Sequence, residues 1–267
     1  MSTTLTVALI SDVFFAADGV ERLRERLRDA RMNGAELVLL PELPLNRWSP
    51  ATPNIDAADA EAPNGPRAEI LRCAARDAGV ATLGGVIQRD PVTGRRHNTA
   101  LLIDARGTVI NSYRKLHLPE EAGFHETHHY EPGDAAPDVI RALAMPVGVQ
   151  ICSDTNRPLG SYVLASRGAE AVLIPRATEA ATFDRWRLVF QANALVSASY
   201  VLSVNRPAME QGVALGGPSI VVSPHGDVML ETTDTVAFAT LDREAVATAR
   251  RMYPGYLPWR FDIWSAH

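Results

Sequence analysis

One stretch of this 267-residue chain occurs twice, and the duplication restricts the fold more than any other feature. The segment Gly-Ala-Glu-Leu-Val-Leu-Leu-Pro-Glu at 34–42 parallels Gly-Ala-Glu-Ala-Val-Leu-Ile-Pro-Arg at 168–176. In both copies a glycine suited to ending a helix precedes a continuous apolar run. Such a run is typical of a strand that is buried on both faces. The chain therefore consists of two roughly equivalent halves rather than an array of short repeats.

Hydrophobic periodicity extends these halves into alternating strands and helices. In the first half we expect strands at 5–10, 37–40, 81–88, 98–104 and 109–113, and helices at 19–33 and 68–78. In the second half we expect strands at 148–151, 171–174 and 200–204, helices at 159–167 and 186–197, and a strand–turn–strand around Gly226. Two such halves predict an α/β fold in which two sheets face each other and helices cover the outer faces.

A single α/β domain spanning residues 1–267 is compatible with this length. The last segment, 242–267, is expected to begin as a helix. It ends in a tail rich in proline and aromatic residues, namely Pro254, Tyr256, Pro258, Trp259 and Trp264. Exposed aromatic side chains are usually covered by another protein surface. We therefore expect this tail to lie at a subunit interface of a homodimer or a larger homo-oligomer.

The overall charge and the apolar pattern exclude several classes of partner. The formal net charge is −5 and the basic residues are scattered, so we expect no nucleic acid to bind. No apolar stretch reaches the roughly 20 residues that span a bilayer, and the first residues do not resemble a secretory signal. The chain has only two cysteines, which is too few for a disulfide framework. We therefore expect a reducing, cytoplasmic location without membrane attachment.

Three residues with reactive side chains follow hydrophobic strands directly. Cys152 follows the strand expected at 148–151, Glu42 follows 37–40, and Lys115 follows 109–113. In α/β folds the ends of strands are where ligands collect. A cysteine that attacks an amide needs a base for its proton and an electrophilic group for the developing oxyanion. A helix start and a lysine ammonium near Cys152 would both favour the thiolate, whereas Cys73 fits an inert cysteine within a helix.

The surroundings of these three residues resemble, in order, the three signatures of the nitrilase superfamily of carbon–nitrogen hydrolases. The segments are Leu-Val-Leu-Leu-Pro-Glu-Leu around Glu42, Tyr-Arg-Lys-Leu-His-Leu-Pro around Lys115 and Gly-Val-Gln-Ile-Cys-Ser-Asp around Cys152. The resemblance implies a four-layer α-β-β-α sandwich with an internal pseudo-two-fold repeat. It also implies that Glu42 is the general base, Lys115 the oxyanion stabiliser and Cys152 the nucleophile. The second glutamate of the family corresponds to Glu126.

Departures from the family pattern indicate the branch. Ser153-Asp154 follows the cysteine, where members that act on nitriles usually have Trp-Glu. The resemblance therefore implies hydrolysis of an amide or N-carbamoyl bond of a small molecule, less readily a nitrile, through a cysteine thioester. Neither a metal nor an organic cofactor is required. We expect the backbone N–H of Ser153 to bind the oxyanion, and we include His117 among the residues that bind substrate.

Arg176 is an additional candidate that comes from the duplication. It occupies the position in the second half that Glu42 occupies in the first, so both should face the same crevice. It could bind a carboxylate of the substrate, a role that Thr155 and Asn156 cannot fill ionically. An internal ion pair, for example with Glu179, is the other interpretation.

Two functions of other classes compete with this hypothesis. The segment His125-Glu126-Thr127-His128-His129 satisfies the H-E-x-x-H pattern of zinc hydrolases. That chemistry needs an amphipathic helix and a third ligand, and Gly123 and Pro132-Gly133 enclose the segment instead. A non-catalytic member that acts as a binding or assembly protein is the second alternative. The departures after Cys152 favour it, whereas the presence of all three reactive residues opposes it.

Overall fold

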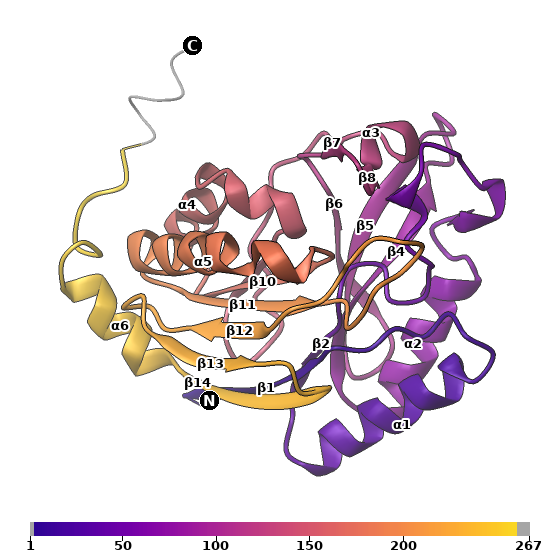
Figure 1. Cartoon of the computed structure of the whole chain (residues 1–267). Helices are drawn as coiled ribbons and strands as arrows, with labels where there is room; N and C mark the ends of the chain where they lie inside the picture. The colour runs from indigo at the N-terminus through magenta and orange to yellow at the C-terminus, as the bar shows by residue number, and fades with distance from the viewer. Residues whose placement is uncertain (1–2, 261–267) are drawn as a thin grey trace.

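The computed structural model describes residues 3–260 and contains two sheets that face each other (Figure 1). The seven-stranded sheet has the order β14-β1-β2-β4-β5-β6, with β3 paired to β4, and the five-stranded sheet has the order β13-β12-β11-β10-β9. The strands of the seven-stranded sheet are β1 (Thr4–Ile10), β2 (Leu37–Leu39), β3 (Ala60–Glu61), β4 (Ala81–Arg89), β5 (Arg96–Ile103), β6 (Val109–Arg114) and β14 (Val236–Asp242). Those of the other sheet are β9 (Val147–Val149), β10 (Ala171–Arg176), β11 (Tyr200–Asn205), β12 (Ser219–Val222) and β13 (Val228–Thr232).

The helices are α1 (Gly19–Met32), α2 (Pro66–Ala78), α3 (Glu126–His129), α4 (Leu159–Ser166), α5 (Phe183–Ser197) and α6 (Arg243–Arg251). Short 3-10 helices are η1 (Ser49–Ala51), η2 (Ala57–Asp59), η3 (Cys152–Asn156) and η4 (Ala180–Thr182). A small separate hairpin pairs β7 (Glu120–Glu121) with β8 (Phe124–His125). The predicted elements therefore all occur, with ends shifted by a few residues.

The duplication read from the sequence corresponds to a repeated topology. β1 and β2 are parallel, β2 and β4 are parallel, and β5 and β6 follow antiparallel. In the second half β9, β10 and β11 are parallel in the same way, and β12 and β13 follow antiparallel. The helices also correspond, since α1 and α2 connect the first parallel strands and α4 and α5 connect the second. The predicted α-β-β-α sandwich with its internal repeat is confirmed.

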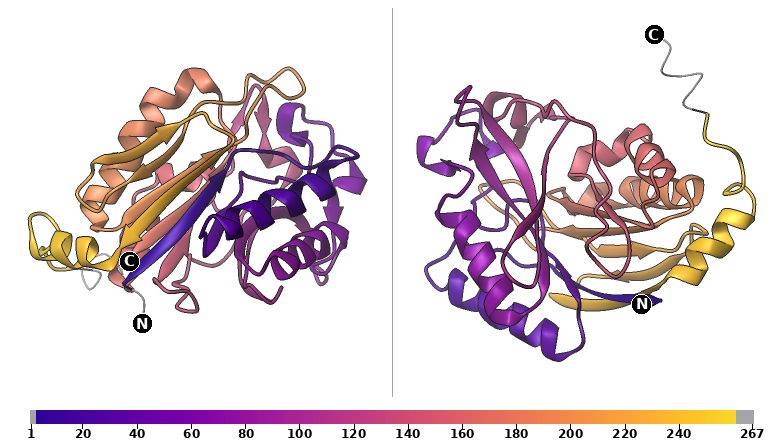
Figure 2. Two further views of the ribbon diagram at one scale, coloured as in Figure 1. Left: turned by 90° about the horizontal axis from the view of Figure 1, so that it is seen from below. Right: turned by 180° about the vertical axis from the view of Figure 1, so that it is seen from behind.

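The strands at the centre of each half are buried on both faces, as their apolar sequences predict. In β2 the side chains of Leu37 and Leu39 pack between the two sheets, and Val38 packs against α1 and α2. This alternation follows from the two-residue period of a strand. Helices α4 and α5 cover the outer face of the other sheet in the same manner. Figure 2 shows the resulting layers, with one helix pair outside each sheet.

The sequence pattern did not reveal β14, which pairs antiparallel with β1 along the whole length of both strands. Within β14 only Ala239 and Leu241 are buried, and the apolar residues at its start are exposed or half-buried, so its sequence lacks the pattern of a buried strand. The segment from Lys115 to Pro137, in which no strand or helix was expected, contains β7, β8 and α3. These elements are only two to four residues long, too short to give a periodic signal.

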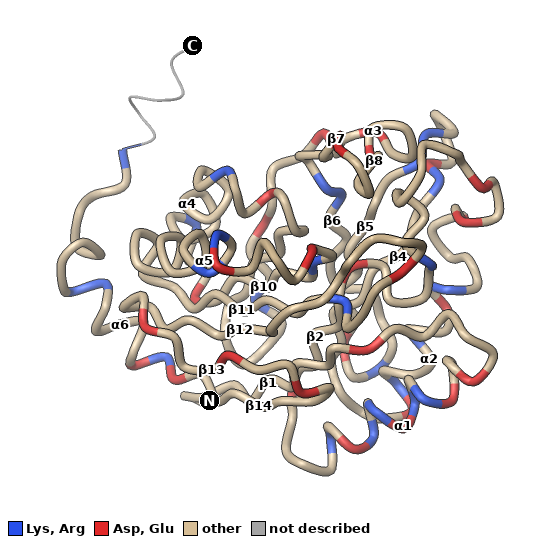
Figure 3. The backbone as a smooth tube through the Cα atoms, in the orientation of Figure 1, with Lys and Arg blue, Asp and Glu red and all other residues tan. Residues whose placement is uncertain are grey.

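Helix α1, which carries many charged residues, does not form a purely basic surface. Arginines and acidic residues alternate along α1, and Figure 3 shows both signs along its length. Between residues 3 and 260, no helix combines the length and the apolar character that crossing a bilayer would require.

The C-terminal segment begins with α6, as expected. Its large side chains divide into two groups. Tyr253, Tyr256 and Leu257 are exposed, whereas the ring of Trp259 packs edge-on against Tyr162 of α4 at 4.5 Å between ring centroids. Trp264 lies outside the described residues. Packing of the tail on a partner subunit stays a prediction.

Candidate active site

Glu42, Lys115 and Glu126 form a charged cluster that is almost completely shielded from solvent. Lys115 Nζ donates to Glu42 Oε1 at 2.9 Å and to Glu126 Oε1 at 2.7 Å. The exposed fractions of the three side chains are 0%, 1% and 0% for Lys115, Glu42 and Glu126. The second carboxylate oxygen, Oε2, of both glutamates has no hydrogen-bond partner among the described residues. A buried carboxylate oxygen without a partner is energetically unfavourable unless it has a task in the reaction.

Several groups fix the position of Glu42. Asn98 Nδ2 donates to Glu42 Oε1 at 2.7 Å. The fully buried guanidinium of Arg206 donates to the backbone oxygens of Glu42 and Leu43 at 2.8 and 2.9 Å. Leu43 has a φ of 49°, a conformation that is uncommon for residues other than glycine. The chain therefore turns sharply after Glu42, and backbone strain of this kind is concentrated at functional sites.

Cys152 begins η3 directly after β9 and also has a left-handed backbone conformation, with a φ of 47°. Its side chain is nearly buried, and its thiol lies 3.7 Å from the backbone oxygen of Ala177. The thiol interacts electrostatically with Glu42, Lys115 and Glu126. Residues that are far apart in the sequence therefore meet at one point between the two sheets.

Burial shifts the pKa values of Glu126 and Lys115. Desolvation raises the pKa of Glu126 to about 8, with Lys115 opposing and Glu42 adding to the shift. For Lys115 desolvation alone would lower the pKa, but the carboxylates of Glu126 and Glu42 outweigh it and raise the pKa well above its usual value. The cluster thus keeps the lysine charged, whereas burial disfavours the charged form of Glu126.

The expectation that the surroundings of Cys152 favour its thiolate was wrong. Burial is the largest effect, and together with the negative charge of Glu42 it raises the pKa of the Cys152 thiol, although Lys115 acts in the opposite direction. The first residues of a short 3-10 helix do not compensate for this desolvation. A base must therefore remove the proton during the reaction.

Asp154 connects the cysteine segment to the lysine segment, a role that no sequence pattern had indicated. Its Oδ1 accepts from the backbone N–H groups of Leu116 and His117 at 3.1 and 2.9 Å. Its Oδ2 accepts from the Tyr113 hydroxyl at 2.8 Å and from the N–H of Ile151 at 3.1 Å. Asp154 therefore fixes the distance between the residues next to Cys152 and those next to Lys115.

A pocket of about 430 Å³ leads from the surface to Cys152. This volume suits a small molecule. Its walls contain Ser153 and His117, as expected, together with the apolar side chains of Leu118, Phe124 and Trp186. The charged residues in its walls are Glu121, Arg157 and Glu179, none of which forms an ion pair with another described residue. Arg157 was missed as a candidate because it lies one position beyond the pair Thr155 and Asn156.

Arg176 is not part of the pocket wall, and its contacts do not support binding of a substrate carboxylate. Its guanidinium donates to Ser203 Oγ at 2.9 Å, to Thr178 Oγ1 at 2.7 Å and to the backbone oxygen of Pro218. It also lies over the rings of Phe183 and Phe190, at 5.5 and 5.6 Å from their centroids. The expected ion pair with Glu179 is absent from the described residues. The backbones of the two equivalent positions are nevertheless close together, because the N–H of Glu42 donates to the backbone oxygen of Arg176 at 3.4 Å.

The zinc-hydrolase interpretation of the H-E-x-x-H segment is contradicted by the geometry. The helix α3 covers only four residues, and the buried His129 donates through Nε2 to the backbone oxygen of Thr52 at 2.7 Å. His125 instead contacts Glu120, and Glu126 contacts Lys115. The two histidines of the pattern therefore do not face a common ion.

Comparisons with known proteins agree with this arrangement. The sequence model of the family described as carbon-nitrogen hydrolase matches residues 13–251. A citrullinase from Francisella tularensis is 28% identical, covering 85% of this chain and 84% of its own length. An omega-amidase, NIT2-A from Xenopus laevis, is 29% identical, covering 98% and 96%.

Solved structures have the same fold. A carbon-nitrogen hydrolase from Helicobacter pylori superposes with a TM-score of 0.89 at 20% identity, over 98% of this chain and 97% of its own. A mutant of the amidase from Nesterenkonia sp. AN1 superposes with a TM-score of 0.75 at 24% identity, over 92% and 94%. In that mutant the acetamide moiety of fluoroacetamide is covalently attached to the active-site cysteine.

Proposed function

The chain belongs to the carbon–nitrogen hydrolase family, and from this premise we propose that it is an amidase whose nucleophile is Cys152. One observation carries the proposal. The buried cluster of Glu42, Lys115 and Glu126 lies beside a thiol at the inner end of a pocket, and Glu42 Oε2 is without a partner. A base, a cation and a nucleophile are the groups that acyl transfer through a thioester requires.

The proposed reaction has two steps. Glu42 takes the proton of Cys152 as the thiolate attacks the carbonyl carbon, and the charge that develops on oxygen is stabilised by Lys115 and by the N–H of Ser153. The first N–H groups of a helix such as η3 have no partner within the helix, which supports this role for Ser153. Ammonia then leaves, protonated by Glu42, and water hydrolyses the thioester with the same base. Glu126 holds the ammonium of Lys115 in place.

The charged side chains of the pocket suit a substrate that carries a positive and a negative group at the end remote from the amide. Among residues 3–260, Arg157 has no ion-pair partner, and neither do the acids Glu121 and Glu179 in the same walls. We therefore propose an amino acid whose side chain ends in an amide or ureido group. Relatives of this chain include a citrullinase and an omega-amidase, and both names are consistent with such a substrate.

A panel of substrates tests this function. We expect ammonia release from side-chain amides and ureido compounds of amino acids at rates well above those of simple aliphatic amides and nitriles. The Arg157→Gln variant should raise KM for the zwitterionic substrates about tenfold or more, because an ionic hydrogen bond to the carboxylate is lost. It should leave KM for a neutral aliphatic amide unchanged.

Arg167 provides the matched control for this experiment. It lies on the surface beyond α4, and its guanidinium donates to the backbone oxygen of Pro137. Arg167→Gln should change neither the KM for the zwitterionic substrates nor the KM for the neutral aliphatic amide. Absence of ammonia release from every amide, ureido compound and nitrile in the panel would favour the alternative of a non-catalytic binding protein. An equal effect of Arg157→Gln on neutral and charged substrates would contradict only the assignment of the substrate class.

The raised pKa of the Cys152 thiol predicts how its alkylation depends on pH. A group with a raised pKa is protonated at neutral pH, and its reactive thiolate fraction grows as pH increases. We expect the rate of Cys152 alkylation by iodoacetamide to rise about tenfold per pH unit from pH 6 to 8.5. Peptide mass spectrometry would follow it, with Cys73 in the same digest reporting reagent consumption. A rate that is already constant at pH 6 would mean a preformed thiolate and would contradict the proposed proton transfer.

We further propose that residues 1–267 form one domain, that the protein functions in the reducing cytoplasm, and that it associates as a homodimer or larger homo-oligomer. Both cysteines are free thiols, which supports the location. The exposed side chains of Tyr253, Tyr256 and Leu257 after α6 support the association.

A further inference from the structure

The hairpin of β7 and β8 has two functionally different faces. Its register pairs Glu121 with Phe124 and Glu120 with His125. Because successive side chains of a strand point to opposite faces, these two pairs lie on opposite sides of the hairpin. Glu121 and Phe124 line the pocket that leads to Cys152. Glu120 and His125 therefore lie on the side that faces away from the pocket.

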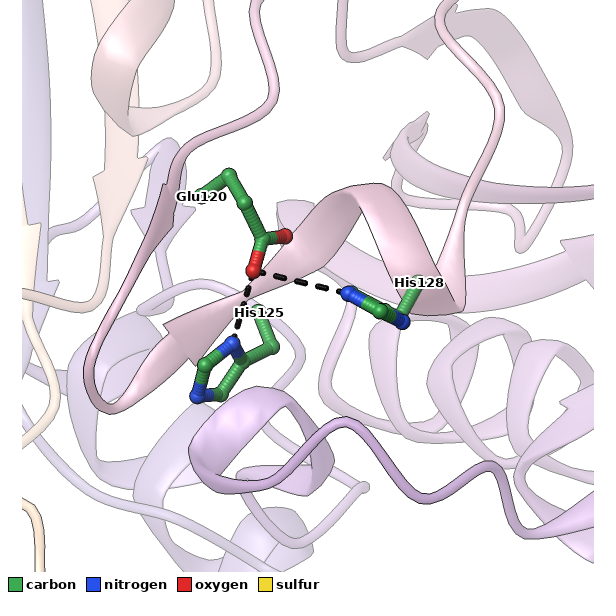
Figure 4. A group of neighbouring side chains, drawn as sticks. All are labelled: Glu120, His125 and His128. Atoms are coloured by element: carbon green, nitrogen blue, oxygen red, sulfur yellow. Dashed lines mark hydrogen bonds and ion pairs between the residues drawn. The ribbon is translucent and has the colours of Figure 1, made fainter.

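His128 of α3 joins this second pair. Glu120 Oε1 lies 2.7 Å from His125 Nδ1 and 3.6 Å from His128 Nε2. The three ligand atoms all lie within 4.8 Å of one another. Figure 4 shows both imidazole rings turned towards the same carboxylate oxygen. The side chains of His125, His128 and Glu120 are 26%, 52% and 40% exposed, so an ion can reach them from solvent.

Two imidazole nitrogens and one carboxylate oxygen are a ligand set that late divalent transition metals prefer, Zn²⁺ above all. With metal–ligand distances of about 2.1 Å, a tetrahedral site needs its ligand atoms about 3.4 Å apart. The distances from Glu120 Oε1 to His125 Nδ1 (2.7 Å) and to His128 Nε2 (3.6 Å) each differ from this value by less than an ångström. Small side-chain rotations would therefore suffice.

The carboxylate of Glu120 is also prepared for such a role. Its other oxygen, Oε2, accepts a hydrogen bond from the hydroxyl of Thr127. A hydrogen bond from outside the ligand set, which orients the ligating carboxylate, is a common feature of metal sites.

We propose that Glu120, His125 and His128 form a binding site for one Zn²⁺ or a similar late divalent transition metal, with water completing the coordination. The site is separate from the H-E-x-x-H pattern, because it uses His128 instead of His129 and excludes Glu126. Glu126 lies between the two histidines in the sequence and contacts Lys115. The ion would therefore fasten the hairpin to α3 on either side of Glu126 and stiffen one wall of the pocket, without taking part in the reaction.

Titration of the chelator-treated full chain with ZnCl₂ in a calorimeter tests the proposal. We expect one saturable site in the unmodified protein and at least tenfold weaker binding in His128→Ala, whose exposed side chain can be removed without disturbing the core. His225→Ala removes another exposed histidine and should bind as the unmodified protein does. Cys152→Ala should also bind normally, which separates this site from zinc capture by the thiol.

A second readout reports the ligands directly. Co²⁺ in a tetrahedral or five-coordinate site gives visible absorption bands, and these should appear in the unmodified protein and in His225→Ala but be lost in His128→Ala. The proposal is overturned if the unmodified protein shows no saturable binding, which would leave an ordinary ion pair of Glu120 with His125. It is equally overturned if His128→Ala binds zinc as tightly as the unmodified protein does.

Discussion

The Cys152→Ala variant is expected to lose amide hydrolysis by at least roughly 10⁴-fold, because no thioester can form without the thiol. The fold should be unaffected. Within residues 3–260 the thiol forms one weak hydrogen bond, to the backbone oxygen of Ala177 at 3.7 Å, and it otherwise packs in the apolar core between the sheets. Alanine carries the same Cβ as cysteine, so the backbone strain at the positive φ of this position does not change. Initial rates of ammonia release and a thermal melt of the same preparation would measure both effects.

Cys73→Ala is the matched control for this variant. Cys73 lies in α2, where its thiol contacts Glu69 and Arg76. Its removal should leave kcat unchanged. With the unmodified enzyme, rapid quenching followed by intact-mass measurement should also reveal a covalent acyl adduct that Cys152→Ala lacks. Residual activity of Cys152→Ala above about one per cent would exclude covalent catalysis through this residue.

The Glu42→Gln variant is expected to reduce kcat by a factor of about 10² to 10⁴, the usual contribution of a general base. Glutamine has nearly the same shape and can still accept hydrogen bonds from Asn98 and Lys115 through its amide oxygen. It cannot take the proton of Cys152 at the position of the unpaired Oε2. The loss should therefore be in kcat, and KM should change little.

Glu61→Gln separates loss of the base from loss of a buried carboxylate. Glu61 is also buried, but it accepts from the backbone N–H groups of Arg67 and Ala68 at the start of α2. Its substitution should lower the melting temperature without lowering kcat. If Glu42→Gln retained its kcat, or if both variants lost activity only in proportion to lost stability, Glu42 would not be the base.

Much of the fold was predictable because strong local signals agreed with one another. The apolar runs at 37–40 and 171–174 are buried on both faces, and glycines end the helices in front of them. β14 was not predictable from its own residues. It is stable because it pairs with β1, whose position depends on the folding of the whole first half.

The proximity of the candidate site residues was predictable, whereas their electrostatics were not. The ends of the strands place Glu42, Lys115 and Cys152 at one edge of the facing sheets, so their types and positions suffice to group them. The protonation of Cys152 depends on how completely the folded chain removes water, and this raises its pKa against the effect of Lys115. Asp154 and Arg206 were missed because their contacts are made with residues far away in the sequence.

The duplication shows most clearly what the sequence by itself determined and what only the tertiary structure decided. The repeated segments determined that Glu42 and Arg176 end equivalent strands, and their backbones do meet. The direction of each side chain depended on where its strand stopped. β10 continues to Arg176, which therefore points to the same face as Val172 and Ile174, under the aromatic rings of α5. β2 stops at Leu39 and the chain turns at Leu43, so Glu42 leaves that alternation and reaches Lys115.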